Sequence, residues 1–151
     1  MKKVLIILTL IMCTFFTACP VAAESQNTEI NYTVAESYTW SAPAAITFTN
    51  NINTETKSGT LSVSENIITA GKTLTIKIAN NEDFLLTGPE GDTRAFTVKK
   101  GSDTIAAGGT VLTVAAGTNT GSADLSFILT SVTVQKAGTY SGTCEFVASV
   151  A

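Results

Sequence analysis

Short runs in which apolar residues alternate with Thr, Ser or Lys recur through most of the chain after residue 24. The clearest run is residues 74–78, where Leu74, Ile76 and Ile78 have one parity and Thr75 and Lys77 have the other. Because successive side chains of a strand point to opposite faces, this run has one apolar and one polar face. Such segments are typical of antiparallel sheets that bury one face and expose the other.

The same alternation predicts strands in seven further segments. These are residues 30–34, 45–48, 61–63, 95–98, 111–114, 125–129 and 140–150. Clusters that each contain Gly predict turns at residues 57–59, 70–72, 88–92, 100–103, 108–109 and 137–138. Residues 116–124 are expected to form a surface loop, and the single Trp40 and most Phe residues to lie between sheets. The pattern predicts an all-β fold, an antiparallel two-sheet β-sandwich of the Ig-like kind, with a barrel as the alternative.

The first 23 residues have the pattern of a bacterial-type secretory signal peptide. Lys2 and Lys3 precede an apolar run over residues 4–16, which is short for a membrane span. Val21 and Ala23 are small residues at positions −3 and −1 of a cut before Glu24. We therefore predict a signal helix in residues 1–23 and one domain, residues 24–151, outside the cell and associated with its surface.

Two alternatives to cleavage before Glu24 remain. Residues 16–19, Phe-Thr-Ala-Cys, loosely resemble the signal that leaves a lipidated Cys at the new N-terminus, so Cys19 is a candidate lipidation residue. In that case the domain would be tethered to a membrane, and otherwise we expect no membrane contact. An uncleaved membrane anchor is the second alternative.

Charge and cysteine content restrict the function classes further. Removal of the signal leaves seven basic and twelve acidic residues, a net charge of −5, which excludes a basic nucleic-acid surface. Cleavage before Glu24 leaves Cys144 as the single cysteine, so no disulfide forms within the domain. We expect Cys144 to be a buried, inert thiol, with a reactive or intermolecular role as the alternative.

Catalytic chemistry is poorly represented. The chain has no His, which removes the commonest general base and zinc ligand and rules out Ser-His-Asp and Cys-His arrangements. Glu82, Asp83, Glu90 and Asp92 lie close in sequence, but in a segment rich in Asn, Gly and Pro that predicts exposed loops. A calcium site there is a minor alternative. We expect no enzyme activity, cofactor or metal.

The most specific motif lies in residues 136–147, which predict a turn at Gly138 followed by a final strand. Tyr140, Gly142, Cys144 and Phe146 share one parity, and Glu145 has the other. The Ala-Gly-x-Tyr turn with Phe146 six residues after Tyr140 resembles the closing strand of WxL-type Gram-positive cell-surface proteins, with Phe146 in place of Trp and Ala148 in place of Leu. The ending Ala-Gly-x-Tyr-x-Gly also resembles the last strand of secreted pilin-like and spore-coat-type sandwich proteins.

These resemblances imply two functions. The first expectation is a secreted, non-enzymatic surface module that binds a cell-wall polymer or a surface ligand in adhesion. The alternative is a pilin-like or coat structural subunit that assembles with copies of itself by edge-strand addition. In both cases Tyr140, Gly142 and Phe146 are the candidate residues of the assembly or wall-binding strand.

Overall fold

The computed structural model describes residues 28–49 and 52–151 of the chain. It divides the chain into two units, Met1–Thr33 and Val34–Ala151, and the described strands all belong to the second. The predicted signal peptide, residues 1–23, and the candidate lipidation residue Cys19 lie outside the described residues. Within those residues, no helix has the length and apolar character that crossing a membrane requires.

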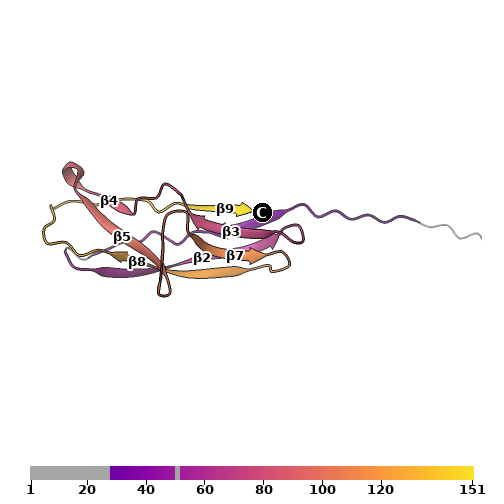
Figure 1. Ribbon diagram of the computed structural model, residues 1–151. Helices are drawn as coiled ribbons and strands as arrows, with labels where there is room; N and C mark the ends of the chain where they lie inside the picture. The colour runs from indigo at the N-terminus through magenta and orange to yellow at the C-terminus, as the bar shows by residue number, and fades with distance from the viewer. Residues whose placement is uncertain (1–27, 50–51) are drawn as a thin grey trace, which may run out of the picture. The chain divides into compact units, whose positions relative to one another are not determined.

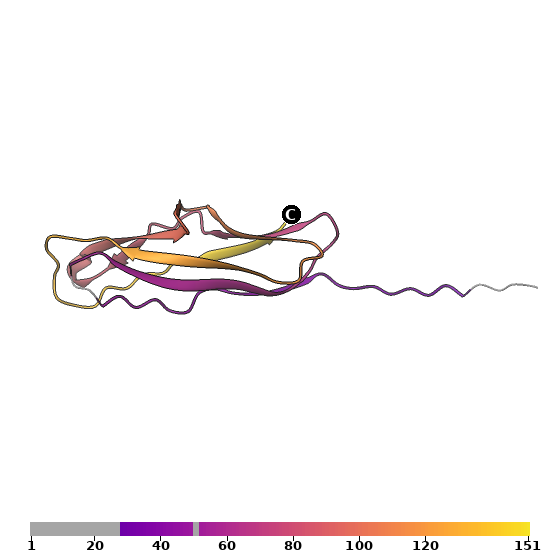
Figure 2. The same cartoon turned by 90° about the horizontal axis from the view of Figure 1, so that it is seen from below.

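The second unit contains two antiparallel sheets (Figures 1 and 2). The larger sheet has the order β1, β2, β8, β5, β4, with β6 paired to β5. Its strands are β1 Ser37–Ser41, β2 Glu55–Ile67, β4 Leu85–Thr87, β5 Thr93–Lys100, β6 Asp103–Ile105 and β8 Gly121–Leu129. The smaller sheet has the order β7, β3, β9, with β3 Thr73–Ile78, β7 Thr110–Ala115 and β9 Phe146–Val150. A short 3-10 segment, η2 (Pro89–Gly91), connects β4 to β5. The predicted all-β sandwich is confirmed.

The core lies between the two sheets and follows the alternation of the sequence. In β3, Leu74, Ile76 and Ile78 are buried, whereas Lys77 is exposed on the opposite face. The larger sheet and β7 contribute the other buried apolar residues, Leu61, Val63, Phe96, Val98, Ile105, Val111, Leu112, Val114, Ala123, Leu125, Phe127 and Leu129. Trp40 packs against this cluster and is partly buried, as expected. Each large side chain buried in this way stabilises the fold by about 1.5–3 kcal/mol.

Several predicted strands match the structure closely. Residues 95–98, 111–114 and 125–129 lie within β5, β7 and β8. Residues 61–63 belong to the much longer β2, and the predicted loop at 116–124 ends at Gly121, where β8 begins. The alternation therefore predicts these strands well, because every second side chain of each strand is buried in the core.

The predicted turn at residues 57–59 is wrong. These residues lie inside β2, where Lys57 pairs with Phe127 and Gly59 pairs with Leu125. A Cβ on Gly59 would lie 2.7 Å from Cβ of Pro43. Gly59 therefore lies where another segment comes close to the strand. Such a close approach explains a Gly within a sheet without any turn.

Two predicted strands are absent and a third is shorter. Residues 30–34 and 45–48 belong to neither sheet, and the final strand begins only at Phe146, so residues 140–145 precede it as an irregular segment. Their sequences alternate as a strand requires, but the described fold gives them no continuous ladder partner. A strand needs such a partner to pair its backbone groups.

The close approach at Gly59 leads to a first prediction. Gly59→Ala would force the new Cβ against Pro43 and should destabilise the fold by about 1–3 kcal/mol, the usual range for overpacking. Urea unfolding of the variant measures this loss. Ser58→Ala, at the neighbouring exposed position, is the control and should leave the unfolding midpoint within error. Equal stability of the two variants would contradict the close contact.

Candidate functional site

A groove of about 1030 Å³ opens between the larger sheet and the start of β9. One wall is formed by residues 42–49, which follow β1, and the other by residues 135–144, which lead into β9. Its floor contains Phe96, Phe127 and Leu129, which also belong to the core. The groove therefore reaches from the surface to the space between the sheets.

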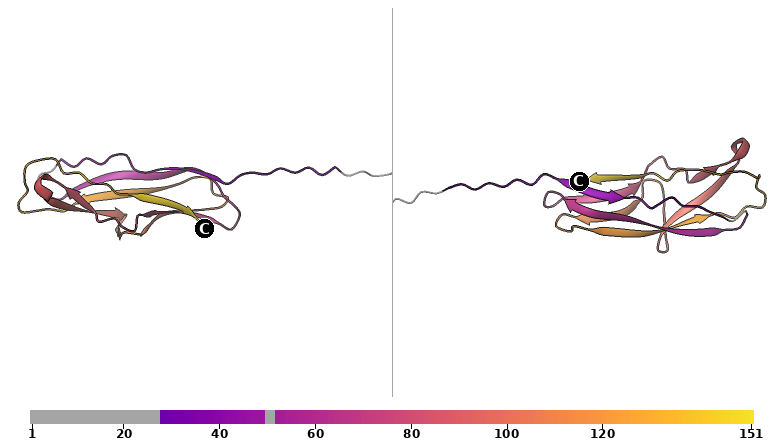
Figure 3. Two further views of the ribbon diagram at one scale, coloured as in Figure 1. Left: turned by 90° about the horizontal axis from the view of Figure 1, so that it is seen from above. Right: turned by 180° about the vertical axis from the view of Figure 1, so that it is seen from behind.

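The edge of β9 beside the groove has no partner in the described residues. β9, the yellow strand in Figure 3, is the last strand of its sheet, and among the described strands it pairs with β3 alone. Thr73 and Ala151 exchange two backbone hydrogen bonds of 2.8 and 3.2 Å. Counting back from Ala151, every second residue of β9 therefore has its backbone groups directed toward β3, and the residues between them do not. The backbone groups of Phe146, Ala148 and Val150 consequently face away from β3. The side chains of the same three residues pack against the core, so this edge is apolar as well as open.

The first wall, residues 42–49, contains a sequence that alternates as a strand does, but it belongs to neither sheet. Pro43, Ile46 and Phe48 are half-buried, and the residues between them are exposed. Ile46 and Phe48 pack against the core cluster. At the end of the wall, the backbone nitrogen and Oγ1 of Thr49 donate hydrogen bonds to the Glu55 carboxylate at 2.6 and 3.0 Å. These contacts hold the wall in place without placing it in a ladder.

The second wall is docked on β4 and η2 through its glycines. A Cβ on Gly138 would lie 2.2 Å from Pro89, and one on Gly142 would lie 2.4 Å from the carbonyl oxygen of Leu85. Tyr140 lies against Gly88, where a Cβ would be 2.3 Å from the ring. The Ala-Gly-x-Tyr-x-Gly motif therefore has a physical explanation, because its small residues let this wall approach β4 and η2 closely.

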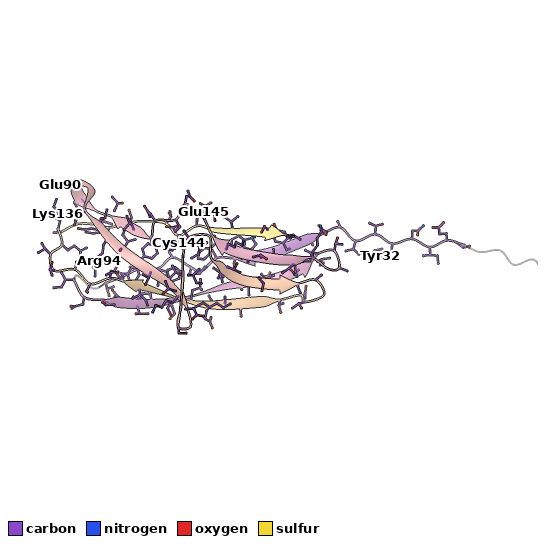
Figure 4. The ribbon with its side chains drawn as sticks, in the orientation of Figure 1. Tyr32, Glu90, Arg94, Lys136, Cys144 and Glu145 are labelled. Atoms are coloured by element: carbon purple, nitrogen blue, oxygen red, sulfur yellow. The ribbon has the colours of Figure 1, made fainter. Side chains whose placement is uncertain are left out.

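Polar contacts reinforce the same docking. Thr87 and Ser141 exchange two backbone hydrogen bonds of 2.8 and 3.0 Å, and Lys136 Nζ lies 2.8 Å from Glu90 Oε2 (Figure 4). The Tyr140 hydroxyl donates a hydrogen bond to the Asp92 carboxylate. This bond lowers the pKa of Asp92, and it raises the pKa of Tyr140. The bond is therefore strongest where Asp92 is ionised and Tyr140 is neutral.

Arg94 organises one end of the groove. Its side chain is buried, with the residue only 3% exposed, on the core-facing parity of β5. Nε donates to the Thr130 carbonyl at 3.0 Å, Nη1 to Gln135 Oε1 at 3.0 Å, and Nη2 to the Asn53 carbonyl at 2.8 Å. A buried guanidinium is tolerated only when its donors are satisfied in this way. Arg94 thus ties β5 to the segments on either side of it.

The sequence-predicted residues come together at this groove. Tyr140, Gly142, Cys144 and Phe146 all line it, but Thr139, Ser141 and Thr143 of the other parity line it too, because this segment is not a regular strand; Glu145 is exposed. The thiol of Cys144 is half-buried, and burial together with the charge of Glu82 raises its pKa to about 12. The raised pKa disfavours the thiolate, which is the reactive form, and the inert role stays a prediction.

Sequence reasoning missed Arg94 and did not give residues 42–49 a role in a site. Arg94 shares the parity of Phe96 and Val98, and a cation at an apolar position of a predicted strand is a usable signal. The wall at residues 42–49 carried no comparable signal, because its alternation is that of an ordinary strand.

The acidic residues in the segment 82–92 make structural contacts. Glu82 accepts hydrogen bonds from the backbone nitrogens of Phe84 and Glu145, at 3.3 and 3.0 Å, and Asp83 accepts one from Leu85 at 3.1 Å. In the part of the chain that the structure describes, no three His, Cys, Asp or Glu residues gather where they could hold a metal ion. The calcium alternative therefore gains no support.

Comparison with known proteins finds a distant structural likeness. No family model matches the chain, and no curated protein matches it. The fold is similar to a solved structure described as the P pilus rod subunit PapA, with 13% sequence identity and a TM-score of 0.45. The match covers 77% of this chain and 96% of the other. This likeness is too distant to carry an argument about function. The WxL-type and spore-coat-type resemblances stay confined to the motif that suggested them.

The Tyr140–Asp92 bond leads to a second prediction. Because the folded pKa of Asp92 is lowered, its stabilisation is lost as pH falls below about 4; because that of Tyr140 is raised, its stabilisation is lost as pH rises above about 10. Tyr140→Phe should therefore flatten the dependence of unfolding free energy on pH in both ranges. Urea titrations at several pH values measure it, with Tyr38→Phe as the control. An unchanged acid limb would contradict the bond.

Proposed function

We propose that this protein is a structural subunit that assembles with copies of itself, each copy adding a strand to the groove of another. The observation that carries the proposal is the groove, which combines partly buried apolar side chains, among them Ile46, Phe48, Leu86 and Phe146, with a sheet edge that has no partner strand in the described residues. An added strand would satisfy both at once. Its backbone would pair with the edge and its alternate side chains would enter the groove.

The edge of β9 suits such an addition. The outward backbone groups of Phe146, Ala148 and Val150 are spaced as a partner strand requires, and a strand beside them would extend the smaller sheet. Exposed strand edges that keep free pairing groups are templates for another chain. Side chains that enter the groove would cover the partly buried Ile46, Phe48 and Phe146, and each apolar side chain that the added strand buries would contribute about 1.5–3 kcal/mol.

Residues 28–34 of a second copy have the properties of the added strand. Ile30 and Tyr32 are each 89% exposed and Val34 is 54% exposed, at every second position of the chain (Figure 4, Tyr32). In an extended strand these three side chains share one face, and Asn31 and Thr33 share the other. Seven extended residues span about 23 Å, enough to run along the five residues of β9, which span about 17 Å.

The same segment is the predicted strand at residues 30–34 that belongs to neither sheet. Its sequence favours a strand, and a second copy would supply the ladder partner that its own described fold does not. The proposal thus gives one explanation for an unfilled groove and for an exposed alternating segment.

Assembly would take place outside the cell, at its surface, if the predicted signal peptide directs export. Binding of a cell-wall polymer or a surface ligand in adhesion was the first expectation from the sequence and stays a prediction, as does the lack of enzyme activity. Assembly among copies is the function that the groove favours.

The experiment compares association of the protein beginning at Glu24 with two variants. Ile30→Asp with Val34→Asp puts two charges on the apolar face of the segment and should weaken association at least about 100-fold, since burial of two apolar side chains is lost. The matched control is Asn31→Asp with Thr33→Asp, which adds the same charge to the other face and should still associate. Size-exclusion chromatography with light scattering over a concentration series measures all three.

A wild-type protein that stays monomeric at every accessible concentration would contradict the proposed function. Equal weakening by both double variants would also contradict it, because charge alone would then be responsible. Association that only the first double variant loses is the expected result.

A further inference from the structure

The chain just before β9 continues the hydrogen-bonding pattern of that strand. From Ala151 back to Val147, every second residue directs its backbone groups toward β3. The next residue of this series is Glu145, whose carbonyl oxygen accepts a hydrogen bond from the Ala79 nitrogen at 2.9 Å. Ala79 directly follows β3, so the pairing of the two segments extends past the first residue of β9.

A side chain completes the pairing of Glu145. The Ala79 carbonyl accepts hydrogen bonds from the nitrogens of Glu82 and Gly108, at 3.4 and 3.2 Å. The Glu145 nitrogen donates to Oε2 of Glu82 instead, at 3.0 Å. Oε1 of the same carboxylate accepts from the Phe84 nitrogen at 3.3 Å. The carboxylate of Glu82 thus takes the place of the backbone acceptor that a regular ladder would supply at this step.

Ser141 has a comparable orientation four residues earlier, through its two backbone hydrogen bonds with Thr87. Thr87 and Glu82 both line a smaller hollow beside this segment, together with Ser141 and Glu145. Neither Thr87 nor Glu82 lines the groove, which lies on the other side of the segment. Ser141 and Glu145 therefore direct their paired backbone groups away from the groove.

The adjoining backbone groups consequently point toward the groove. In a trans peptide bond the C=O and the N–H point in opposite directions, and none of the described peptide bonds is cis. The carbonyl groups of Tyr140 and Cys144 and the N–H groups of Gly142 and Phe146 thus lie on the groove side. With the outward groups of β9, they form one line of pairing groups over the eleven residues 140–150.

We propose that a strand of a second copy pairs with this whole line, residues 140–150, and that Glu82 is the positioning residue that keeps its two halves aligned. This inference rests on the proposed function and extends the acceptor edge beyond β9. The line begins beside β4, where Ser141 bridges to Thr87, and ends in the smaller sheet. A single added strand would therefore be hydrogen-bonded along both sheets.

The length of the line fits one segment of the chain. Eleven residues exceed the seven residues 28–34, which are long enough for β9 alone. Cleavage before Glu24, which the sequence predicts, would leave the eleven residues 24–34 in front of Ala35. A strand of that length would cover the line from end to end.

Peptide length tests the extent of the edge. The acceptor is the protein beginning at Glu24 with Ile30→Asp and Val34→Asp, and the probes are synthetic peptides of residues 24–36 and 28–36. The longer peptide should slow hydrogen exchange at Gly142 together with Phe146. It should bind at least about 10-fold more tightly, because it makes additional backbone hydrogen bonds. The longer peptide with Ser25→Pro and Asn27→Pro is the matched control and should bind as the shorter one does, because Pro lacks the N–H.

Glu82→Ala in the same acceptor tests the positioning residue. With the longer peptide, this variant should lose the protection of Gly142 and bind at least about 10-fold more weakly, while Phe146 stays protected. Asp83→Ala is the matched control, because Asp83 accepts a hydrogen bond from Leu85 in the same loop and should leave both unchanged. The amides of Val147 and Ser149, measured without peptide, show whether β9 is formed.

The outcomes separate this inference from the proposed function. Equal binding of the two peptides, or protection of Phe146 without Gly142, would overturn the inference alone. A Glu82→Ala variant that behaves as Asp83→Ala does, or that loses β9 altogether, would overturn the positioning role of Glu82. No protection of Phe146 or Gly142 with either peptide at saturation would contradict the proposed function and the inference with it.

Discussion

The backbone groups of Phe146, Ala148 and Val150 point away from β3 at the margin of the smaller sheet, and their side chains face the core. A sheet edge is stable alone when it is short, charged or covered. This edge is short but apolar, and it borders a groove that leads to Phe96 and Phe127. An added strand would pair with this edge and cover the groove beside it, as the proposed assembly requires.

The second wall explains why the most specific motif of the sequence lies where it does. Gly138, Tyr140 and Gly142 dock residues 135–144 on β4 and η2, so the chain reaches Phe146 along one fixed path. Arg94 holds the same segment at Gln135. The motif thus shapes the groove, whichever chain fills it, and this role accounts for its small residues without any contact to a ligand.

Much of the fold could be predicted from the sequence because alternation reports burial directly. Leu74, Ile76 and Ile78 are buried as their parity predicts, whereas residues of both parities line the groove between Gln135 and Cys144. Strand pairing is harder to predict from local sequence, because it depends on segments that are distant in the chain. Gly59 lies within a strand because β2 pairs with β8, and its position allows Pro43 to come close; no local pattern contains that information.

The two strand predictions that the structure contradicts fail for the same reason. Residues 30–34 and 45–48 alternate correctly but gain no ladder in the described fold. Strand propensity reflects how side chains fit a half-buried pleated surface, and it does not supply a neighbour. In the proposed assembly, residues 30–34 would become a strand in the groove of a second copy, and residues 45–48 of that copy would line the groove beside them.

Hydrogen exchange of the β9 amides is the most direct test of whether an added strand pairs with this edge. A synthetic peptide of residues 28–36 is added to the Ile30→Asp, Val34→Asp protein, whose own segment no longer competes. The account predicts slowed exchange at Phe146, Ala148 and Val150, whose amides face the open edge, with little change at Val147 and Ser149, which face β3. Unchanged exchange at the first three amides with saturating peptide would contradict it.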